Sequence, residues 1–341
     1  MTIPSLFDNR LRLPLIAAPM FLSSGPELVI ACCKAGIVGT FPAKNQRTVE
    51  GLDAWLDTIT SELAAFEAET GRKAAPFGVN LIVHKSNETL KDELAMVAKY
   101  KVPLVITSLG AVSDLIEEVH HYGGIVFHDV INMRHARKAV GAGVDGLIAV
   151  AAGAGGHTGQ ANPFGLVNEI KQEFDVTVLL SGSLSSGGDI AAAQMMGADF
   201  AYMGTRFIAT EESLSQDDYK NMIVDAEASD IVLTDTITGV NASFMTQSLN
   251  AVGIDITSLK EHGALDINKE LSDARDGETN DITPWRDIWS AGQGVGTISS
   301  VEPVASLIDT LADEYHSRFA EQTAQASSFA SYPPHDQPQK G

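Results

Sequence analysis

Short apolar runs alternate with longer amphipathic segments eight times between residue 13 and about residue 213. Each run is almost continuously apolar, as in Gly-Leu-Ile-Ala-Val at 146–150, and does not alternate with polar residues. Such runs are typical of parallel strands buried on both faces, and amphipathic segments are typical of the helices that cover them. Eight strand–helix units predict an α/β fold of the (β/α)8 TIM-barrel type. The predicted strands span 13–18, 37–41, 77–83, 103–107, 125–128, 146–150, 176–180 and 200–203.

A doubly wound sheet would also alternate strands and helices. The count of eight, and the absence of a Gly-x-Gly-x-x-Gly run after the first strand, favour the barrel. Residues 214–285 break the alternation with many Asp, Ser, Thr and Asn residues, and we expect an accessory helical segment or lid there. The predicted division is therefore a barrel over 1–213, the accessory segment over 214–285, a barrel-completing loop and C-terminal helix over 286–320, and a flexible tail over 321–341.

The charge and the cysteines of the chain restrict its partners and its compartment. A formal net charge of −21 disfavours nonspecific binding to nucleic acid or to an anionic membrane. The sequence has no apolar run of roughly 18 residues and no signal-peptide pattern. Cys32 and Cys33 are adjacent in an apolar stretch, so we expect reduced core thiols in a cytoplasmic protein without a metal site. The expected partner is a small-molecule substrate, and a homo-oligomer is compatible with the sequence.

The strand ends of the predicted barrel select the candidate site residues, because active sites of such barrels form at the C-terminal ends of the strands. One candidate run is Ala-Gly-Gly-His-Thr-Gly at 154–159, after the sixth strand, which contains Gly156 and His157. Its glycines allow a sharp turn and the close approach of a ligand, and the histidine can act as a general base or hydrogen-bond donor. A loop histidine that only caps a turn is the alternative, and the flanking glycines favour a site.

Two further clusters follow the seventh and eighth strands, where barrels often bind phosphate with backbone N–H groups and a helix N-terminus. They contain Gly182 and Ser183, and Gly204 and Thr205. Tight turns without a ligand are the alternative role of these glycines. Arg206 either reaches the phosphate or forms an ion pair behind the eighth strand.

Other polar and apolar side chains at strand ends have two interpretations each. Asn80 either pairs with the edge of a cofactor ring or bonds to the backbone. His128 either lines the pocket or satisfies a buried polar contact, and Asp129 either contacts a ligand or fixes a loop. Met20 is either a core residue or a cofactor contact. The loop with Trp289 and Gln293 either covers a ligand or only packs.

Five of these runs together resemble the nitronate monooxygenases, formerly called 2-nitropropane dioxygenases. They are Ala-Pro-Met at 18–20, Phe-Gly-Val-Asn-Leu at 77–81, 154–159, Ser-Gly-Ser at 181–183 and Met-Gly-Thr-Arg-Phe at 203–207. Flavin-dependent enoyl-acyl-carrier-protein reductases and NAD(P)H:quinone reductases of the same fold share these signatures. The resemblance implies a TIM barrel with noncovalent FMN. It places the phosphate on Gly182, Ser183, Gly204 and Thr205, the flavin ring near Ala18, Met20, Asn80, His128 and Gln293, and His157 beside the reacting face.

The resemblance implies oxidation of alkyl nitronates, or of nitroalkanes, by O2 to a carbonyl compound and nitrite. An NAD(P)H-dependent reductase of a quinone or enoyl thioester is the alternative enzyme, and a flavin-binding scaffold subunit of low activity is the alternative of another class. Two positions depart from the family pattern. Many relatives have Gly-Gly where this chain has Gly182-Ser183, so phosphate binding by the Ser183 N–H requires that the backbone there needs no positive φ. Asp129 is an acid where some relatives carry a base.

Overall fold

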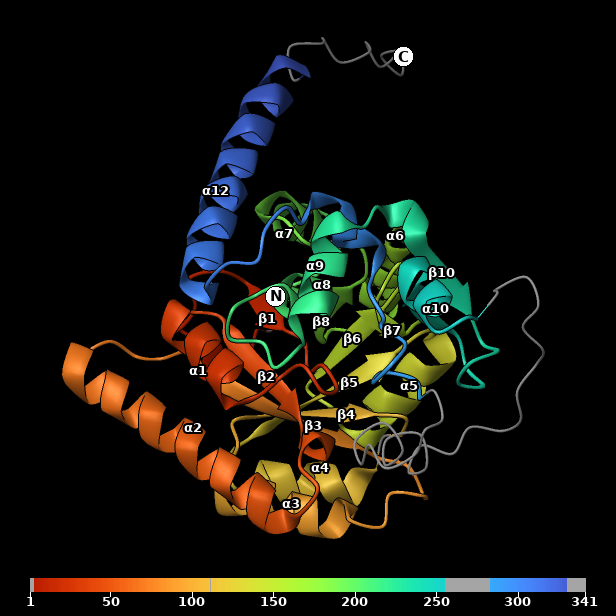
Figure 1. Ribbon diagram of the computed structural model, residues 1–341. Helices are drawn as coiled ribbons and strands as arrows, with labels where there is room; N and C mark the ends of the chain where they lie inside the picture. The colour runs from red at the N-terminus through yellow and green to blue at the C-terminus, as the bar shows by residue number, and fades with distance from the viewer. Residues whose placement is uncertain (1–2, 111, 255–282, 330–341) are drawn as a thin grey trace, which may run out of the picture.

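The computed structural model describes residues 3–110, 112–254 and 283–329, and its centre is a closed barrel of eight parallel strands (Figure 1). Each strand pairs with its neighbour in chain order, and β9 closes the ring on β1 through the register Leu15↔Ala201. The predicted (β/α)8 barrel is therefore confirmed. Its strands are β1 Leu15–Ala17, β2 Val38–Pro42, β3 Phe77–Ile82, β4 Leu104–Ser108, β5 Ile125–Val130, β6 Gly146–Val150, β8 Thr177–Ser181 and β9 Phe200–Met203.

A helix follows each strand, and all of these helices except the short last one cover the outside of the barrel. Local sequence signals set the ends of several of these helices, because unpaired terminal amides need a side-chain acceptor. The Thr48 side chain accepts from Gly51 N, and Ser186 forms a capping box with Asp189. The helices are α1 Pro26–Ala35, α2 Val49–Thr70, α3 Leu90–Lys99, α4 Ser113–His121, α5 Met133–Ala142, α6 Pro163–Glu173, α7 Gly187–Met195 and the short α8 Thr205–Ile208.

Apolar side chains fill the barrel interior, so the barrel is a packed core with its opening at one end. Phe7, from the short helix η1 (Ser5–Phe7), packs against Phe127 and Phe200 inside the barrel, with ring centroids 6.2 and 5.0 Å away. Burying three aromatic rings in contact contributes strongly to stability. The N-terminal segment with Phe7 thus fills the N-terminal end of the barrel, and the barrel remains open to ligands at the C-terminal ends of its strands.

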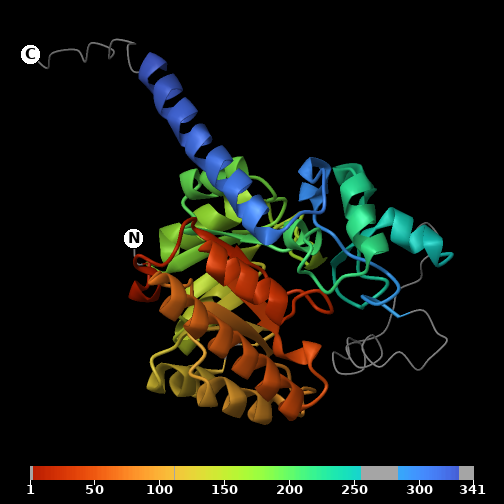
Figure 2. The ribbon, with the colours of Figure 1, turned by 60° about the vertical axis from the view of Figure 1, so that its left-hand side comes forward.

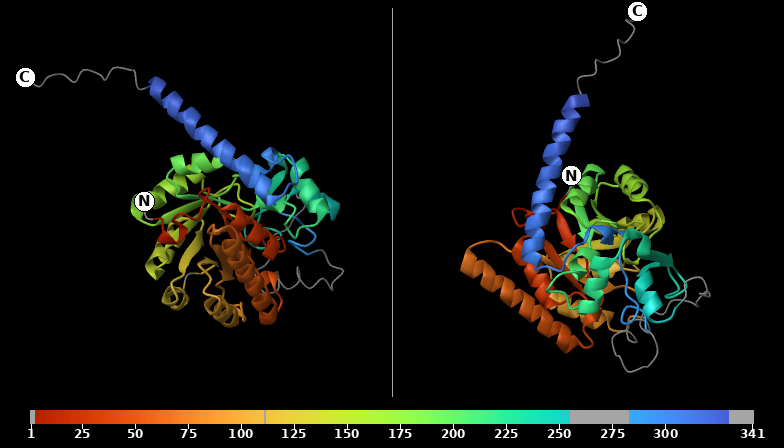
Figure 3. Two further views of the ribbon diagram at one scale, coloured as in Figure 1. Left: turned by 90° about the vertical axis from the view of Figure 1, so that its left-hand side faces the viewer. Right: turned by 45° about the horizontal axis from the view of Figure 1, so that its top comes forward.

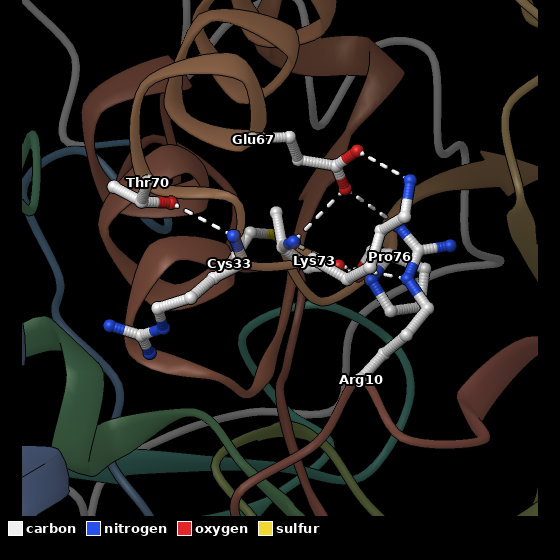
Figure 4. Close-up of polar contacts among 8 residues, drawn as sticks. Arg10, Cys33, Glu67, Thr70, Lys73 and Pro76 are labelled. Atoms are coloured by element: carbon white, nitrogen blue, oxygen red, sulfur yellow. Dashed lines mark hydrogen bonds and ion pairs between the residues drawn. The ribbon is translucent and has the colours of Figure 1, made fainter.

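Polar contacts fix the connection between α2 and β3 (Figure 4). Glu67 accepts from Ala74 N at 3.0 Å and pairs with Lys73 at 3.0 Å, while Arg10 Nε donates to the Ala74 carbonyl at 2.8 Å. Beside them the buried thiol of Cys33 contacts the Pro76 carbonyl at 3.6 Å. Cys32 and Cys33 are both free and fully buried core residues, in agreement with the prediction of reduced thiols.

The chain beyond β9 forms an accessory layer at the C-terminal end of the barrel (Figure 2). It contains the predicted helical structure, α9 Asp217–Asp225 and α10 Thr246–Ala251, but also two strands that the sequence pattern did not predict, β10 Ile231–Thr234 and β11 Ala242–Met245. These strands join β7 (Gly156–His157) in an antiparallel sheet of order β10-β11-β7. Residues 255–282 of the predicted accessory segment lie outside the described residues.

The C-terminal helix α12 (Val304–Phe329) packs against α7 and α1 and then extends past the body of the barrel (Figure 3). Its contact with α7 requires Gly187, where a Cβ atom would lie 2.1 Å from the Leu311 carbonyl oxygen. The predicted flexible tail over 321–341 is wrong up to Phe329, because the helix continues through those residues; 330–341 lie outside the described residues. Among the helices described, none is long and apolar enough to cross a membrane.

Candidate active site

A cavity of about 930 Å³ opens at the C-terminal ends of the barrel strands, which is within the size range of cofactor and substrate sites. It brings together residues that are far apart in the sequence. Gln293 is the exception among the predicted site residues, because its side chain is exposed and outside the lining of the cavity. The predicted residues that line the cavity are Ala18, Met20, Asn80, His128, Gly156, His157, Gly182, Ser183, Gly204 and Thr205.

Tertiary pairing positions His157. The residue lies on β7 opposite Ala242 of β11, and the next residue, Thr158, donates from its backbone N–H to the Asn241 carbonyl at 3.0 Å. On the other side, Gly156 N donates to Ser290 Oγ at 2.6 Å. The run after β6 is therefore a short, hydrogen-bonded strand held from two distant segments of the chain, which favours the site interpretation over a loose turn.

The side chain of His157 borders the cavity and is exposed to it. The ring of Trp285 contacts it edge to face, with centroids 5.2 Å apart and planes at 80°. The side chain is accessible from the cavity, yet desolvation by the surrounding protein lowers the pKa of His157 to about 4. The imidazole is therefore neutral at pH 7, and a neutral imidazole can both donate and accept a hydrogen bond.

The loop after β8 forms a glycine turn with unusual backbone angles. Gly182 has φ +125°, and a Cβ atom there would lie 2.9 Å from the Ala152 carbonyl oxygen. Ser183 has φ +57°, a left-handed conformation that costs a non-glycine residue roughly 1–2 kcal/mol. The Ser183 N–H donates to the Gly153 carbonyl at 3.1 Å. The condition for phosphate binding by this N–H, a backbone without positive φ, is therefore not met, although Ser183 lines the cavity.

The loop after β9 presents a helix N-terminus to the same cavity. Gly204 precedes α8, whose first amides, at Thr205 and Arg206, have no acceptor within the helix. The Thr205 hydroxyl accepts from Gly292 N at 2.9 Å, which ties the 290–294 loop to this end of the barrel. Arg206 is buried and pairs with Glu302, so of its two predicted roles the ion pair is the one the structure shows.

Asn80 and His128 line the opposite wall of the cavity and are nearly fully buried. The Asn80 amide donates to Ser108 Oγ at 2.8 Å and to the Ile106 carbonyl at 3.3 Å, so it has protein partners while it lines the pocket. His128 Nδ1 lies 2.7 Å from Thr107 Oγ1. Burial, together with the nearby His135 and Lys138, lowers the pKa of His128 to about 4, so this ring is also neutral at pH 7.

Asp129 is a buried acid on the cavity wall with one unpaired oxygen. Its Oδ2 accepts from Ser108 Oγ at 2.5 Å, but the buried Oδ1 has no hydrogen-bond partner among the described residues. Desolvation raises the pKa of Asp129 to about 6, which the Ser108 hydrogen bond only partly offsets. An unpaired buried carboxyl oxygen that lines a cavity is a natural contact for a ligand.

Replacement of Asp129 by asparagine is expected to stabilise the protein in a pH-dependent way. The native pKa of about 6 exceeds the usual 3.8, so the native state binds more protons than the unfolded state between these values. The free energy of unfolding of the wild type therefore falls as pH rises through this window, and the variant lacks that loss. We expect the variant to be about 1–3 kcal/mol more stable at pH 8 and equal to the wild type near pH 4.

The measurement is urea unfolding of both proteins at pH 4 and pH 8. Asp175→Asn, on the exposed turn before β8, is the matched control and should show no such difference between the two pH values. Equal stabilities of Asp129→Asn and wild type at pH 8 would show that the Asp129 carboxylate is not destabilised by burial.

Several cavity residues were not predicted from the sequence. Trp285, Ser290 and Tyr219 come from segments outside the eight units; Tyr219 stacks on Trp289 with centroids 5.0 Å apart and donates to the Ser290 carbonyl. The only sequence signal that could have found these three residues is an aromatic ring or a hydroxyl group in a segment that is otherwise polar. Three basic residues at the start of α5 were also missed, although a cluster of cations just after a barrel strand is a recognisable pattern. They are Arg134, His135 and Lys138.

A (β/α)8 barrel with a histidine, a glycine turn and a helix N-terminus around one large cavity is the arrangement of a cofactor-dependent enzyme. The family model described as nitronate monooxygenase matches residues 86–314. The chain belongs to the nitronate monooxygenase family, and it is a flavin-dependent oxidoreductase.

Three known proteins illustrate the relationship. A nitronate monooxygenase of Paraburkholderia phytofirmans is 26% identical over 349 residues, which cover 88% of this chain and 92% of the relative. A (3aS,4S,5R,7aS)-5-hydroxy-7a-methyl-1-oxo-octahydro-1H-indene-4-carboxyl-CoA dehydrogenase of Rhodococcus jostii is 27% identical over 208 residues, 61% of this chain and 55% of the relative. The structure of FabK from Thermotoga maritima superposes with a TM-score of 0.76 at 24% identity, covering 95% of this chain and 100% of that one, and confirms the fold.

The cavity residues fit a flavin. The Gly182 turn and the α8 N-terminus offer a cradle for an anionic phosphate, since a side chain at Gly182 would collide with the backbone and helix N-termini attract anions. The unpaired Asp129 Oδ1 and the buried amide of Asn80 supply polar contacts on the opposite wall. These groups would hold the phosphate at one side of the barrel mouth and the ring system across it.

Proposed function

We propose that this protein oxidises alkyl nitronates with O2 to a carbonyl compound and nitrite, with FMN as its flavin. The observation that carries the proposal is the position of His157, a neutral imidazole fixed on β7 above the cavity that contains the phosphate cradle. FMN is supported because the cradle has one glycine turn and one helix N-terminus, an arrangement that suits a single phosphate group. Bound flavin would accept electrons from the substrate and pass them to O2.

The lowered pKa of His157 favours nitronates over neutral nitroalkanes as substrates. An imidazole with a pKa of about 4 is a weak base for removing a proton from carbon. The same neutral ring can donate an N–H to an oxygen of a nitronate, which is already deprotonated. His157 thus orients the anion, and the edge-on ring of Trp285 restricts the rotation of the imidazole.

A reductase or dehydrogenase that acts on a thioester is the second candidate. It is favoured by the Rhodococcus jostii relative, whose name describes a carboxyl-CoA dehydrogenase. In that case the same flavin site would exchange electrons with a nicotinamide or with the acyl chain. His157 would then bind a carbonyl oxygen in place of a nitronate oxygen.

Anaerobic mixing of the purified flavoprotein with ethyl nitronate, and separately with NADH and NADPH, separates the candidates. We expect the oxidised flavin spectrum to bleach rapidly with the nitronate and slowly with either nicotinamide, and nitrite to form when air is admitted. Rapid bleaching by NADH or NADPH alone would replace the proposal with the reductase. Bleaching by none of the three would indicate the low-activity flavin-binding subunit.

A further inference from the structure

The first turns of α5 place three basic side chains on the wall of the cavity. Arg134 and His135 lie in the first turn and Lys138 one turn later, so all three lie on neighbouring faces of the helix. They follow β5, whereas the phosphate cradle follows β8 and β9 on another part of the ring of strands. This basic wall (Arg134, His135 and Lys138) is therefore separate from the cradle, although both border one cavity.

The described part of the chain provides no acid to neutralise the basic wall. Neither Arg134 nor Lys138 forms an ion pair there, whereas Arg137 on the same helix binds Glu173 through two hydrogen bonds of 2.7 Å. Two carboxylates line the cavity, Asp129 and Asp235, and within the described residues neither pairs with these cations. Arg134 and Lys138 are solvent-exposed where they border the cavity, so in a chain of net charge −21 they form a local cationic region that a ligand can reach.

The cations also lack a structural benefit. Basic residues in the first turn oppose the helix dipole, and like charges four residues apart, as at Arg134 and Lys138, destabilise a helix. Arg134 and Lys138 both lower the pKa of His135, after desolvation, and Lys138 also lowers that of His128. These three groups line the cavity, and no carboxylate of the described residues pairs with Arg134 or Lys138.

We propose that the basic wall binds a phosphate group of an extended ligand whose other end reaches the flavin. The basic wall offers many hydrogen-bond donors: a guanidinium, an ammonium, an imidazole and a helix N-terminus. A carboxylate or nitronate has too few acceptor atoms to use all of them, whereas a phosphate dianion can. Leu109 and Ile131 also line this side of the cavity and are partly exposed, so they offer apolar contact for the arm of such a ligand.

The phosphate could belong to a thioester carrier or to a dinucleotide reductant, and two ligand pairs distinguish these sources. Coenzyme A is compared with 3′-dephospho-coenzyme A, and NADP⁺ with NAD⁺, by titration of the oxidised flavoprotein followed by calorimetry. We expect the phosphorylated member of one pair to have a dissociation constant at least about tenfold lower than that of its partner. This difference corresponds to one charge-assisted hydrogen bond. Because these titrations involve no turnover, their outcome is independent of whether the protein oxidises nitronates.

The double variant Arg134→Gln/Lys138→Gln should bind the phosphorylated member no more tightly than its partner. Its melting temperature should be at least that of the wild type, because the two charges that it removes repel each other on the helix. Arg137→Gln, which removes a cation from the same helix outside the cavity, should retain the full discrimination. The proposal is overturned if wild type distinguishes neither pair, if the double variant keeps the discrimination, or if Arg137→Gln loses it equally.

Discussion

Replacing Gly182 with alanine is expected to lower the affinity for flavin by about 30-fold or more. A Cβ atom at this position would lie 2.9 Å from the Ala152 carbonyl oxygen and 3.2 Å from the Ala151 carbonyl oxygen, both rigid backbone atoms. The φ of +125° is in a region that is accessible essentially only to glycine and costs other residues about 1–3 kcal/mol. The turn must therefore move, and the shape of the proposed phosphate cradle changes with it.

The measurement is the flavin content of the purified variant, from its visible spectrum, together with a titration of the apoprotein by FMN. Gly165→Ala on α6 is the matched control, since a Cβ atom there meets nothing within 4 Å. The control should retain flavin and gain about 0.5–1 kcal/mol of stability from its better helix propensity. Wild-type flavin affinity in Gly182→Ala would show that the phosphate lies elsewhere.

Replacing His157 with asparagine is expected to reduce kcat/KM for a nitronate by about 100-fold while flavin remains bound. The change removes the imidazole N–H that orients the substrate, and loss of one preorganised donor typically costs this much. Asparagine is compatible with the two-residue strand β7, because the pairing of this strand with β11 uses backbone groups. His121→Asn at the end of α4, on the far side of the barrel, is the matched control and should leave the rate unchanged.

The pH profile gives this prediction a second measurement. The pKa of His157 lies near 4, below the usual 6.5, so the ring stays neutral as pH falls from 8 to about 5. Asp129 on the same cavity wall has a pKa of about 6, so the profile is best measured in the Asp129→Asn variant, where the rate with a preformed nitronate should be flat over that range and change only below it. Undiminished nitronate turnover in a His157→Asn variant with bound flavin would exclude the proposed role of this histidine.

Most of the barrel could be predicted because its signals are local. Each strand is a short apolar run that is buried on both faces, and each helix carries its own amphipathic face and caps. The accessory strands β10 and β11 could not be predicted in the same way. The pairing of β11 with β7 joins residues about 85 positions apart, and a pairing of that range leaves little trace in a short window.

The site residues with a local sequence signal could also be predicted, and those without one could not. The glycines and His157 follow strands, so the strand-end rule found them, and all but Gln293 of the predicted set line the cavity. Gln293 does not line the cavity itself, but it adjoins a residue that does, because its N–H donates to the Gly153 carbonyl at 2.9 Å. Trp285 and Ser290 reach the cavity only through the return of the chain after the accessory segment.

The eight repeated apolar runs predicted the barrel, and the barrel determined which end holds the site, because strand–helix–strand units make neighbouring strands parallel and bring their C-terminal ends to one side. The tertiary structure alone decided the state of the groups at that end. It placed Ser183 at a positive φ, gave Asp129 Oδ1 no partner among the described residues and placed the cations of α5 at the cavity. These properties depend on which distant atoms desolvate or contact a group, and that information is not contained in the neighbouring sequence.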